Sequence, residues 1–451
     1  MENKIIFGFD RKIDDTWIPN GYPLSLNKFI TNVSEYFEET GKWPAVYPLG
    51  VVPYETIDKQ LISDIGDKPF LYYVEQFGAI GKVVGEDEGY EDIGFLNNML
   101  ETTKEKLRKK QGVVMVVAHT ESTIEVKTII HLHNTIVEEK ISPNIVGYVM
   151  GNNWSISKEY NAWCDKNDIK ERITLVSCYE QLHNKGYQLL NGNQNENTFI
   201  SDEEFQDKSK KRKHQLVCLN RRIRPHRYAM IAMLHHNNLL ENNLVSFSLE
   251  TGKDLNCMGD KGMPDVDTMR KICGSRELME TYMSYYDELN KISPRTIDYD
   301  NLTEIIGTGY EQKEPYLDSY FSIVTETGFP EPYSGATEKI FRPILHFHPF
   351  IVYGSQGTLS MLRDLGFKTF SPYIDESYDS ERTTFRRMQK ITKEVKRICS
   401  MSKDEMHEWY YQMEDILIYN RELIKKYGAK YDESQKKVIT NLYKELRKIN
   451  V

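Results

Sequence analysis

Short apolar runs alternate with polar or amphipathic stretches along most of this chain, and the alternation limits the folds it can adopt. The runs are short enough for strands, and the stretches between them, such as residues 97–110, are long enough for helices. Strands that alternate with helices build parallel sheets covered by helices, which is the α/β class. The predicted strands are residues 4–9, 70–74, 113–118, 145–150, 173–178, 215–219, 244–248, 320–325 and 350–353.

Residues 191–214 interrupt this rhythm and divide the chain. The segment is rich in asparagine, then acidic, then basic, and it has no apolar period, so we expect a linker or a long loop. A chain of 451 residues is also longer than a single core usually supports. We therefore expect two Rossmann-like domains, residues 1–205 and 206–395, followed by C-terminal helices, residues 396–451, that pack back on the domains.

The C-terminal part has a helical signature. Ser402 and Glu405 have the spacing of a capping box, which marks the start of a helix. Apolar residues then recur at helical spacing, which is typical of a helix face that packs in a core. These residues are Met406, Trp409, Met413, Ile416, Leu417 and Ile424.

Composition disfavours several classes of protein. Aromatic residues make up 12% of the chain, which argues against disorder, and a net charge of −9 disfavours a general affinity for nucleic acid. No apolar run reaches about 18 residues and no cleavable leader is evident, so we expect no membrane span. The six cysteines show no CxxC spacing, which is typical of reduced thiols in a cytoplasmic protein without structural zinc. They are Cys164, Cys178, Cys218, Cys257, Cys273 and Cys399.

The most informative stretch follows the predicted strand 320–325. It gives Glu326, a loop rich in glycine and proline, and then Thr337, Glu338 and Lys339 at the start of an amphipathic segment. In a parallel sheet this order brings a helix N-terminus, a lysine and two carboxylates to the C-terminal edge, where ligands of open sheets bind. Helix N-termini attract phosphate, and a carboxylate can accept from ribose or sugar hydroxyls. The pattern indicates a site for a sugar nucleotide, with Lys339 against phosphate and Glu326 or Glu338 against hydroxyls.

A second motif precedes this stretch. The predicted strand 215–219 is followed by Asn220 and a basic run that ends at Arg227. Together, the Phe321-x-x-x-x-Glu326 strand end, the Thr-Glu-Lys and this Asn with its arginines resemble the GDP-fucose-dependent alpha-1,3-fucosyltransferase family over residues 215–375. This chain departs from the family at Gly335, where the family has tyrosine and the nearest tyrosine is Tyr333, and at Thr327, where the family has asparagine.

The resemblance implies a GT-B glycosyltransferase, in which two Rossmann-like domains face a central crevice. By that resemblance Glu338 holds the ribose, and Lys339 and Arg224 hold phosphate. Residues 1–205 then form the acceptor side and residues 206–395 bind the nucleotide sugar, which is a co-substrate and is GDP-linked in that family, without a further cofactor. The acceptor is a glycan or another hydroxyl compound. The predicted donor-binding residues are Arg221, Arg222, Arg224, Arg227, Glu326, Tyr333, Thr337, Glu338 and Lys339.

An inverting transfer needs a general base, which should come from the first domain. The apolar run 113–118 delivers His119 and Glu121 to the C-terminal end of a strand. We predict Glu121 as the base, His119 as the second candidate and Glu75 as the third, because a carboxylate beside an apolar crevice has its pKa raised toward a useful range. Glu121 is equally compatible with an ordinary loop carboxylate.

Metal-binding motifs are weaker. The sequence Asp265-Val266-Asp267 is short and precedes a helical stretch, where aspartate is a common first-turn residue, so a helix start is expected. The pairs His131 with His133 and His346 with His348 lack a third ligand at a suitable spacing, so ordinary surface or core histidines are expected. The sequence therefore predicts a transferase that works without metal.

Simpler interpretations stay open at this stage. Thr-Glu-Lys is common at ordinary helix starts, and a basic run is usually a solvated face. The cluster at 208–227 could instead follow a nucleic-acid backbone. That leaves a sugar transferase acting on modified bases of viral or phage DNA, or a non-catalytic protein that binds nucleic acid or sugar. The cluster is Lys208, Lys210, Lys211, Arg212, Lys213, Arg221, Arg222, Arg224 and Arg227.

Overall fold

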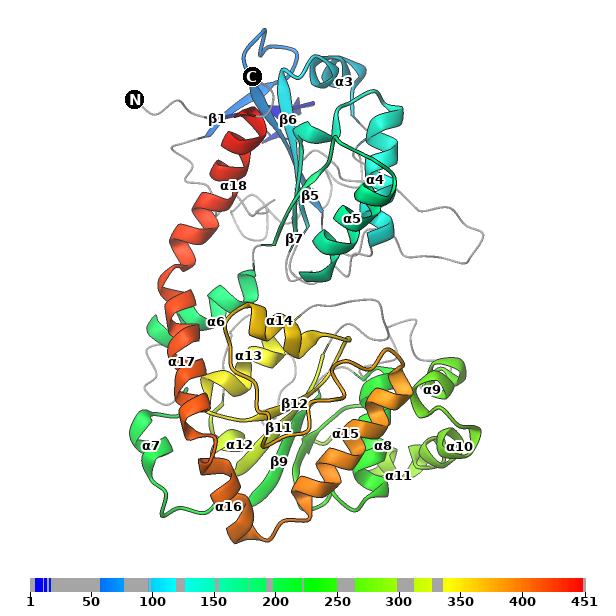
Figure 1. Cartoon of the computed structure of the whole chain (residues 1–451), viewed down its shortest axis with the longest axis vertical. Coiled ribbons are helices and arrows are strands. Elements are labelled where there is room, and N and C mark those ends of the chain that lie inside the picture. Colours follow the sequence, from blue (N-terminus) through cyan, green and yellow to red (C-terminus); the bar gives the residue numbers. More distant parts are fainter. Residues whose placement is uncertain are drawn as a thin grey trace. The chain divides into compact units, whose positions relative to one another are not determined.

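The computed structural model divides the chain into two compact units, residues 1–181 with 430–451 and residues 182–429 (Figure 1). The first division falls inside helix α6 (Glu180–Asn191), ahead of the expected boundary at 205/206. The C-terminal helices are shared between the units, since only the last of them joins the first unit. The structure describes residues 5–10, 12–13, 16–17, 57–76, 96, 99–118, 126–150, 154–177, 179–191, 198–220, 223–249, 264–297, 312–326 and 336–448.

The first unit is built on a six-stranded parallel sheet of order β4-β1-β5-β6-β7-β8. All five strands expected in this half are present, with ends that differ by a few residues at most. Strand β4 was not expected, because its Asp58, Lys59 and Gln60 give it no apolar run; it lies at the sheet edge, paired with β1. The strands are β1 (Ile5–Phe9), β4 (Ile57–Leu61), β5 (Phe70–Gln76), β6 (Gly112–Ala118), β7 (Val146–Met150) and β8 (Thr174–Ser177), with β2 (Lys12–Ile13) and β3 (Thr16–Trp17) as a separate antiparallel pair.

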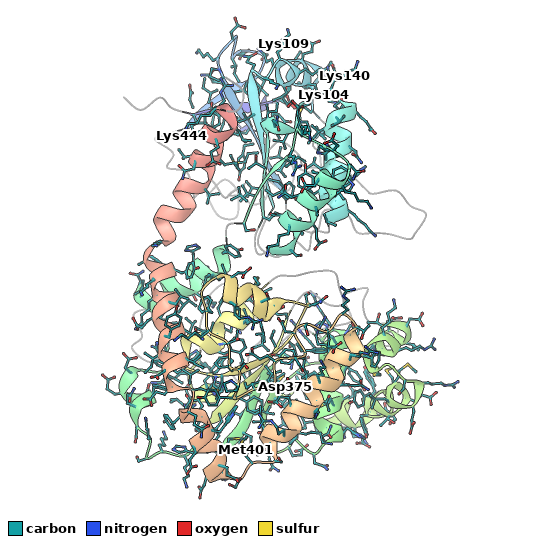
Figure 2. The ribbon with its side chains drawn as sticks, viewed as in Figure 1. Lys104, Lys109, Lys140, Asp375, Met401 and Lys444 are labelled. Atoms are coloured by element: carbon teal, nitrogen blue, oxygen red, sulfur yellow. The ribbon has the colours of Figure 1, made fainter. Side chains whose placement is uncertain are left out.

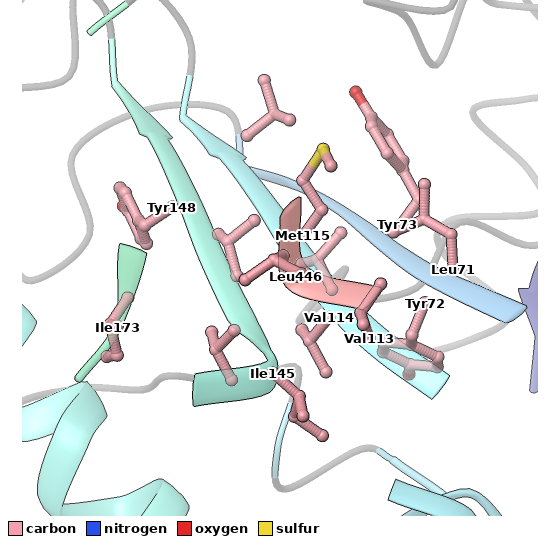
Figure 3. Packing of buried hydrophobic residues seen from close by; sticks show 14 of the residues in the cluster. Leu71, Tyr72, Tyr73, Val113, Val114, Met115, Ile145, Tyr148, Ile173 and Leu446 are labelled. Atoms are coloured by element: carbon pink, nitrogen blue, oxygen red, sulfur yellow. The ribbon is translucent and has the colours of Figure 1, made fainter. Parts of the chain in front are cut away.

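Helices cover both faces of this sheet. In Figure 1, α4 and α5 lie on one side and α18 on the other. Helix α18 packs closely on β7, since a Cβ added at Gly147 would lie 2.7 Å from Leu442. Figure 3 shows Leu446 of α18 among buried residues of the neighbouring strands. Burial on both faces explains the nearly continuous apolar runs. The helices are α3 (Glu101–Arg108), α4 (Val126–Glu138), the 3-10 turn η3 (Pro143–Ile145), α5 (Trp154–Lys166) and α18 (Tyr431–Lys448).

Ion pairs join elements within the first unit. Lys104 of α3, labelled in Figure 2, is largely buried, and its ammonium lies 2.6 Å from a carboxylate oxygen of Glu139. Arg108 reaches the same carboxylate at 3.2 Å. Glu139 follows the end of α4, so these pairs link two helices that are distant in sequence.

The second unit contains a four-stranded parallel sheet of order β10-β9-β11-β12. From β9 the chain moves outward through α8 to β10, and from β11 it moves in the opposite direction through α13 to β12. This reversal creates a switch point between β9 and β11, where open parallel sheets bind ligands. Right-handed crossovers then put α8 and α13 on opposite faces, as Figure 1 shows. The strands are β9 (His214–Leu219), β10 (Leu244–Ser246), β11 (Ser319–Thr325) and β12 (Phe350–Tyr353).

All four strands expected in this half are present, and the α/β prediction is confirmed with parallel sheets. The described part of the chain contains no helix long and apolar enough to cross a membrane. Its four cysteines, Cys164, Cys218, Cys273 and Cys399, are free thiols. Besides α6, the helices of this unit are α7 (Asp202–Gln206), α8 (Pro225–His236), α9 (Val266–Cys273), α10 (Arg276–Ser284), α11 (Tyr286–Lys291), α12 (Glu314–Leu317), α13 (Glu338–Leu345), α14 (Thr358–Asp364), α15 (Thr384–Cys399), α16 (Lys403–Tyr411) and α17 (Glu414–Ala429).

The expected linker at 191–214 is wrong in part, because it contains helix α7. Ser201 and Glu204 form a complete capping box at its start, and the acidic residues lie in its first turn. The helix is a single short one that buries only Phe205 fully, so no apolar period can reveal it in the sequence.

The C-terminal helical prediction is confirmed. Ser402 and Glu405 form both hydrogen bonds of the capping box at the start of α16. Of the predicted core face, Met406, Trp409, Met413, Leu417 and Ile424 are buried, and Ile416 is partly buried.

Helices α6 and α17 cross in unusually close contact at two glycines. A Cβ at Gly186 would lie 2.1 Å from the carbonyl oxygen of Ile424, and one at Gly428 would lie 2.0 Å from the carbonyl carbon of Gly186. Beside the crossing, His183 Nδ1 lies 2.8 Å from the Tyr427 carbonyl oxygen. No side chain fits between these backbones.

The Gly186→Ala variant should therefore be less stable by at least about 2 kcal/mol, because the added methyl group overpacks the crossing. In an ordinary helix the same change stabilises by about 1 kcal/mol. Urea unfolding measures the difference, with Lys426→Ala on the exposed face of α17 as a control that should change stability by no more than about 0.5 kcal/mol. A stabilised Gly186→Ala protein would contradict the close crossing.

Candidate functional site

The candidate site lies at the C-terminal edge of the second sheet, where Asn220 joins three strand ends. Asn220 follows β9, and its backbone N–H donates to the Ser246 carbonyl oxygen at 3.1 Å. Its side-chain oxygen accepts from Thr325 Oγ1 at 2.5 Å. Asn220 is almost fully buried, so it fixes the ends of β9, β10 and β11 at the switch point.

Glu326 follows β11 and is fixed by its neighbours. Its backbone N–H donates to the Tyr353 carbonyl oxygen at 3.0 Å. Its carboxylate accepts from Thr337 Oγ1 at 2.6 Å and from the Thr337 N–H at 3.2 Å. Only 1% of Glu326 is exposed, and burial raises the pKa of its carboxyl group, although Lys339 and the Thr337 bonds act to lower it. The described contacts of this carboxylate therefore hold the start of α13.

Thr337, Glu338 and Lys339 begin helix α13, as the sequence predicts. Thr337 is the N-cap and accepts a long bond from the Lys339 N–H at 3.4 Å. The Lys339 ammonium lies 2.6 Å from a carboxylate oxygen of Glu338, and both side chains are 22% exposed. Burial raises the pKa of the Glu338 carboxyl, but Lys339 and Arg342 outweigh burial and lower that pKa to about 2. The Glu338 carboxylate and the Lys339 ammonium thus lie partly exposed at the switch-point edge.

Helix α8 brings arginines to the same edge. Arg224 is its N-cap and is half-buried, and Pro225 is its first residue. Arg227 lies in the first turn and is 4% exposed, with its guanidinium 3.4 Å from the Thr325 carbonyl oxygen. Burial and the neighbouring Arg224 lower the pKa of Arg227 to about 10, while Glu326 and Glu338 act to raise it. The charges of α8 and α13 therefore form one electrostatic cluster.

His226 connects the two helices through β11. Its Nε2 lies 2.9 Å from the Glu326 carbonyl oxygen. Since a carbonyl oxygen only accepts, Nε2 carries the proton. Burial, followed by Arg227, Arg224 and Lys339, lowers the pKa of His226 well below its ordinary value, so the ring is neutral. Sequence inspection missed this histidine, because its partner is a backbone atom 100 residues away.

The turn after β12 closes the base of the site. A Cβ at Gly354 would lie 3.2 Å from the Cβ and Cγ of Glu326, so a larger residue would press on that side chain. The buried Arg387 donates to the Gly354 carbonyl oxygen at 2.9 Å and also to the Glu381 carbonyl oxygen. Asp379 accepts from the Leu359 N–H at 2.9 Å. Arg387 and Asp379 thus shape this turn, although neither forms a motif in the sequence.

Several predicted residues lie outside the described part of the chain. Arg221, Arg222 and Tyr333, predicted to bind the donor, are among them, as are the candidate bases His119 and Glu121.

The strand ends that carry the candidate bases are described. Glu75 lies within β5, and Gln76 and Ala118 are partners in the register of β5 and β6. The chain therefore continues from both strands at one edge of the first sheet.

The switch point of that sheet lies between β1 and β5, where Asp10 accepts from Tyr72 Oη at 2.8 Å and from the Leu100 N–H at 3.2 Å. Asp10 was not singled out in the sequence; it holds the start of α3.

The metal motifs have structural roles. Asp265 is the N-cap of α9 and accepts from the Thr268 N–H at 2.7 Å, which confirms the predicted helix start. His131 and His133 lie on α4, where His133 Nδ1 is 2.8 Å from Tyr160 Oη. No group of three metal-ligating side chains occurs in the described ranges.

His346 and His348 are core residues of the second unit. His348 lies 2.7 Å from Ser322 Oγ and 2.6 Å from the Ser319 carbonyl oxygen. His346 stacks on Tyr316 with ring centroids 4.3 Å apart. Burial lowers the pKa of both histidines well below the ordinary value, and nearby cations add to the effect. Both rings are therefore neutral parts of the core.

The described part of the basic cluster at 208–213 combines surface ion pairs with one buried arginine. Lys208, Lys211 and Lys213 form ion pairs with Glu414, Asp404 and Asp318. Arg212 is buried; it donates to the carbonyl oxygens of Tyr316 and Ser319, and its guanidinium lies 4.2 Å from the ring centroid of Tyr410. Arg212 is therefore part of the core, whereas the three lysines stay largely exposed, so the nucleic-acid interpretation stays a prediction.

No model of a known protein family matches the chain. Searches of curated proteins and of solved structures also returned no match. Function is therefore inferred from the residues and geometry at the C-terminal edge of the second sheet.

The buried histidines predict a pH dependence of stability. The pKa of His346 is lower in the folded state than in the unfolded state, so its stabilising contribution is complete above about pH 6.5 and is lost as pH falls. Each such histidine adds a slope of up to about 1.4 kcal/mol per pH unit. Urea unfolding between pH 8 and pH 5 should show a shallower decline for His346→Phe, which keeps a ring against Tyr316. Equal slopes would contradict a neutral His346 in the fold.

Proposed function

We propose that this protein is a glycosyltransferase of the GT-B type that moves a sugar from a nucleotide donor to an acceptor hydroxyl, with inversion and without metal. The principal support is the joint position of Lys339, Glu338, Arg224 and Arg227 at the switch point of a parallel sheet. Two helix N-termini and three cations meet there. This is the chemistry that recognises a diphosphate.

Each donor-site residue takes a role that its surroundings support. Lys339 and Arg224 bind the diphosphate and stabilise the charge that develops when the nucleotide leaves. Glu338 is ionised and accepts hydrogen bonds from the ribose hydroxyls. The buried Arg227 strengthens the positive potential at the site. Glu326 does not contact the sugar directly. It acts through Thr337, by holding the start of α13.

The first unit supplies the acceptor side and the base. Glu121 is the proposed base, with His119 and Glu75 as alternatives, and it removes the proton of the acceptor hydroxyl as that oxygen attacks the anomeric carbon.

The described cysteines are free thiols, which fits work in the reducing cytoplasm. The resemblance favours a GDP-linked donor and a glycan or other hydroxyl acceptor. Modified DNA remains an alternative acceptor, with binding through the basic cluster at 208–227.

The Lys339→Ala variant tests the donor site. Loss of one charge-assisted bond costs about 1.5–3 kcal/mol, so donor affinity should fall about 10- to 150-fold. Calorimetry with GDP-, UDP-, CMP- and dTDP-sugars, preceded by a thermal-shift screen, identifies the donor and measures the change. Lys425→Ala is a matched control, because its ammonium also lies 2.6 Å from a carboxylate oxygen, on α17. Unchanged affinity in Lys339→Ala would contradict the assignment.

The Glu121→Gln variant tests the base separately. An amide of the same shape cannot accept the proton, so turnover should fall about 100- to 10,000-fold while the donor dissociation constant stays the same. The anomeric configuration of the product, measured by NMR coupling, should be opposite to that of the donor. A fully active variant would transfer the role to His119 or Glu75, and retention of configuration would remove the need for a base.

A further inference from the structure

We propose that His226 is a positioning residue for diphosphate binding, which fixes Arg224 and Arg227 on α8 against the strand end that holds α13. This inference rests on the proposed function of the site. It adds a residue to which the sequence motif assigns no role and that touches no reacting atom.

The contacts of His226 make it a link between separate elements. Residue 226 lies in the first turn of α8, between the two arginines. Its Nε2–H donates to the carbonyl oxygen of Glu326, the residue that follows β11. Its ring lies edge-on to Tyr353 of β12, with centroids 6.1 Å apart. One side chain therefore joins α8 to the ends of both strands.

The link matters because α8 and α13 start from different strands and lie on opposite faces of the sheet. The carboxylate of Glu326 holds Thr337, and its carbonyl oxygen accepts from His226. Both helix starts are thus fixed to the same residue. A diphosphate bound by Arg224 and Lys339 together depends on the spacing between those starts, and misplacement of one of them weakens both contacts.

The charges around the ring explain why a histidine suits this position. Arg224 and Arg227 face it from its own helix and Lys339 faces it from α13, while the β11 side presents the Glu326 carbonyl oxygen. A neutral imidazole donates the needed hydrogen bond without adding a further positive charge to this group. Lysine or arginine would donate the bond but would increase the repulsion among the cations.

Four variants of the full chain test the proposal, with GDP and inorganic pyrophosphate as calorimetric probes. His226→Leu removes the N–H group that donates to the Glu326 carbonyl oxygen. It should weaken binding of both probes about tenfold, because a displaced Arg224 loses one charge-assisted contact with the phosphate. His226→Gln places an amide nitrogen at the same reach as Nε2 and should restore affinity to within about twofold. His226→Asn places its amide nitrogen one bond short of the Nε2 position, so its affinity for both probes should stay low. This variant tests the proposal if His226→Leu does not fold.

His348→Leu is the matched control. His348 is also fully buried on this sheet, and its Nε2 lies against a backbone carbonyl oxygen, that of Ser319 at the opposite end of β11. The control should lose thermal stability as His226→Leu does, yet bind both probes like the wild type. If buried histidines had only a general structural role, His226→Leu and His348→Leu would bind the probes with equal affinity.

The outcomes separate this inference from the function on which it rests. If the wild type binds the probes and folded His226→Leu or His226→Asn binds them equally tightly, the positioning role is overturned and the diphosphate site is not. Failure of the wild type to bind GDP or pyrophosphate overturns the diphosphate site itself. Rescue by glutamine, with weak binding by asparagine and leucine, supports both.

Discussion

The hydrogen bonds between the Glu326 carboxylate and Thr337 are the interaction on which the candidate site depends. They join the end of β11 to the start of α13. A buried carboxylate is costly unless hydrogen bonds compensate it, and Thr337 supplies two of them. The absence of a side chain at Gly354 leaves the space that Glu326 occupies. Because of this arrangement, Glu338 and Lys339 come to the switch point with a fixed orientation.

The pairing of Lys339 with Glu338 differs from the structural ion pairs of this protein. Lys104 with Glu139 and Lys313 with Glu204 each connect elements far apart in sequence. Lys339 and Glu338 are neighbours in sequence, so their contact contributes little to the fold. A lysine in the first turn of a helix is also disfavoured by the helix dipole. The Glu338 carboxylate at 2.6 Å and the nearby Glu326 carboxylate offset this cost, and under the proposed function the same ammonium binds the phosphate of the donor.

The sequence predicted most of the sheets because their strands are buried on both faces and therefore keep apolar runs. Strand β4 was missed because its edge position permits Asp58 and Lys59. Helix α7 was missed because one buried phenylalanine, Phe205, makes no period. The starts of α13 and α9 were predicted correctly, since caps are local patterns within three or four residues. The sequence therefore predicts the features that residues close together in the chain determine.

The site was predicted only as far as its local motifs extend. Lys339 and Arg224 were singled out because each belongs to a motif that follows a strand along the chain, and the parallel topology then brings those motifs to one edge of the sheet. His226, Asn220 and Arg387 act through backbone atoms or side chains that are distant in sequence, and no spacing rule reveals such contacts. These three residues hold the positions of groups that the motifs identify. In this sheet, motifs therefore indicate which groups are candidates for ligand binding, while the tertiary contacts determine whether those groups lie close enough together to act on the one diphosphate that we propose.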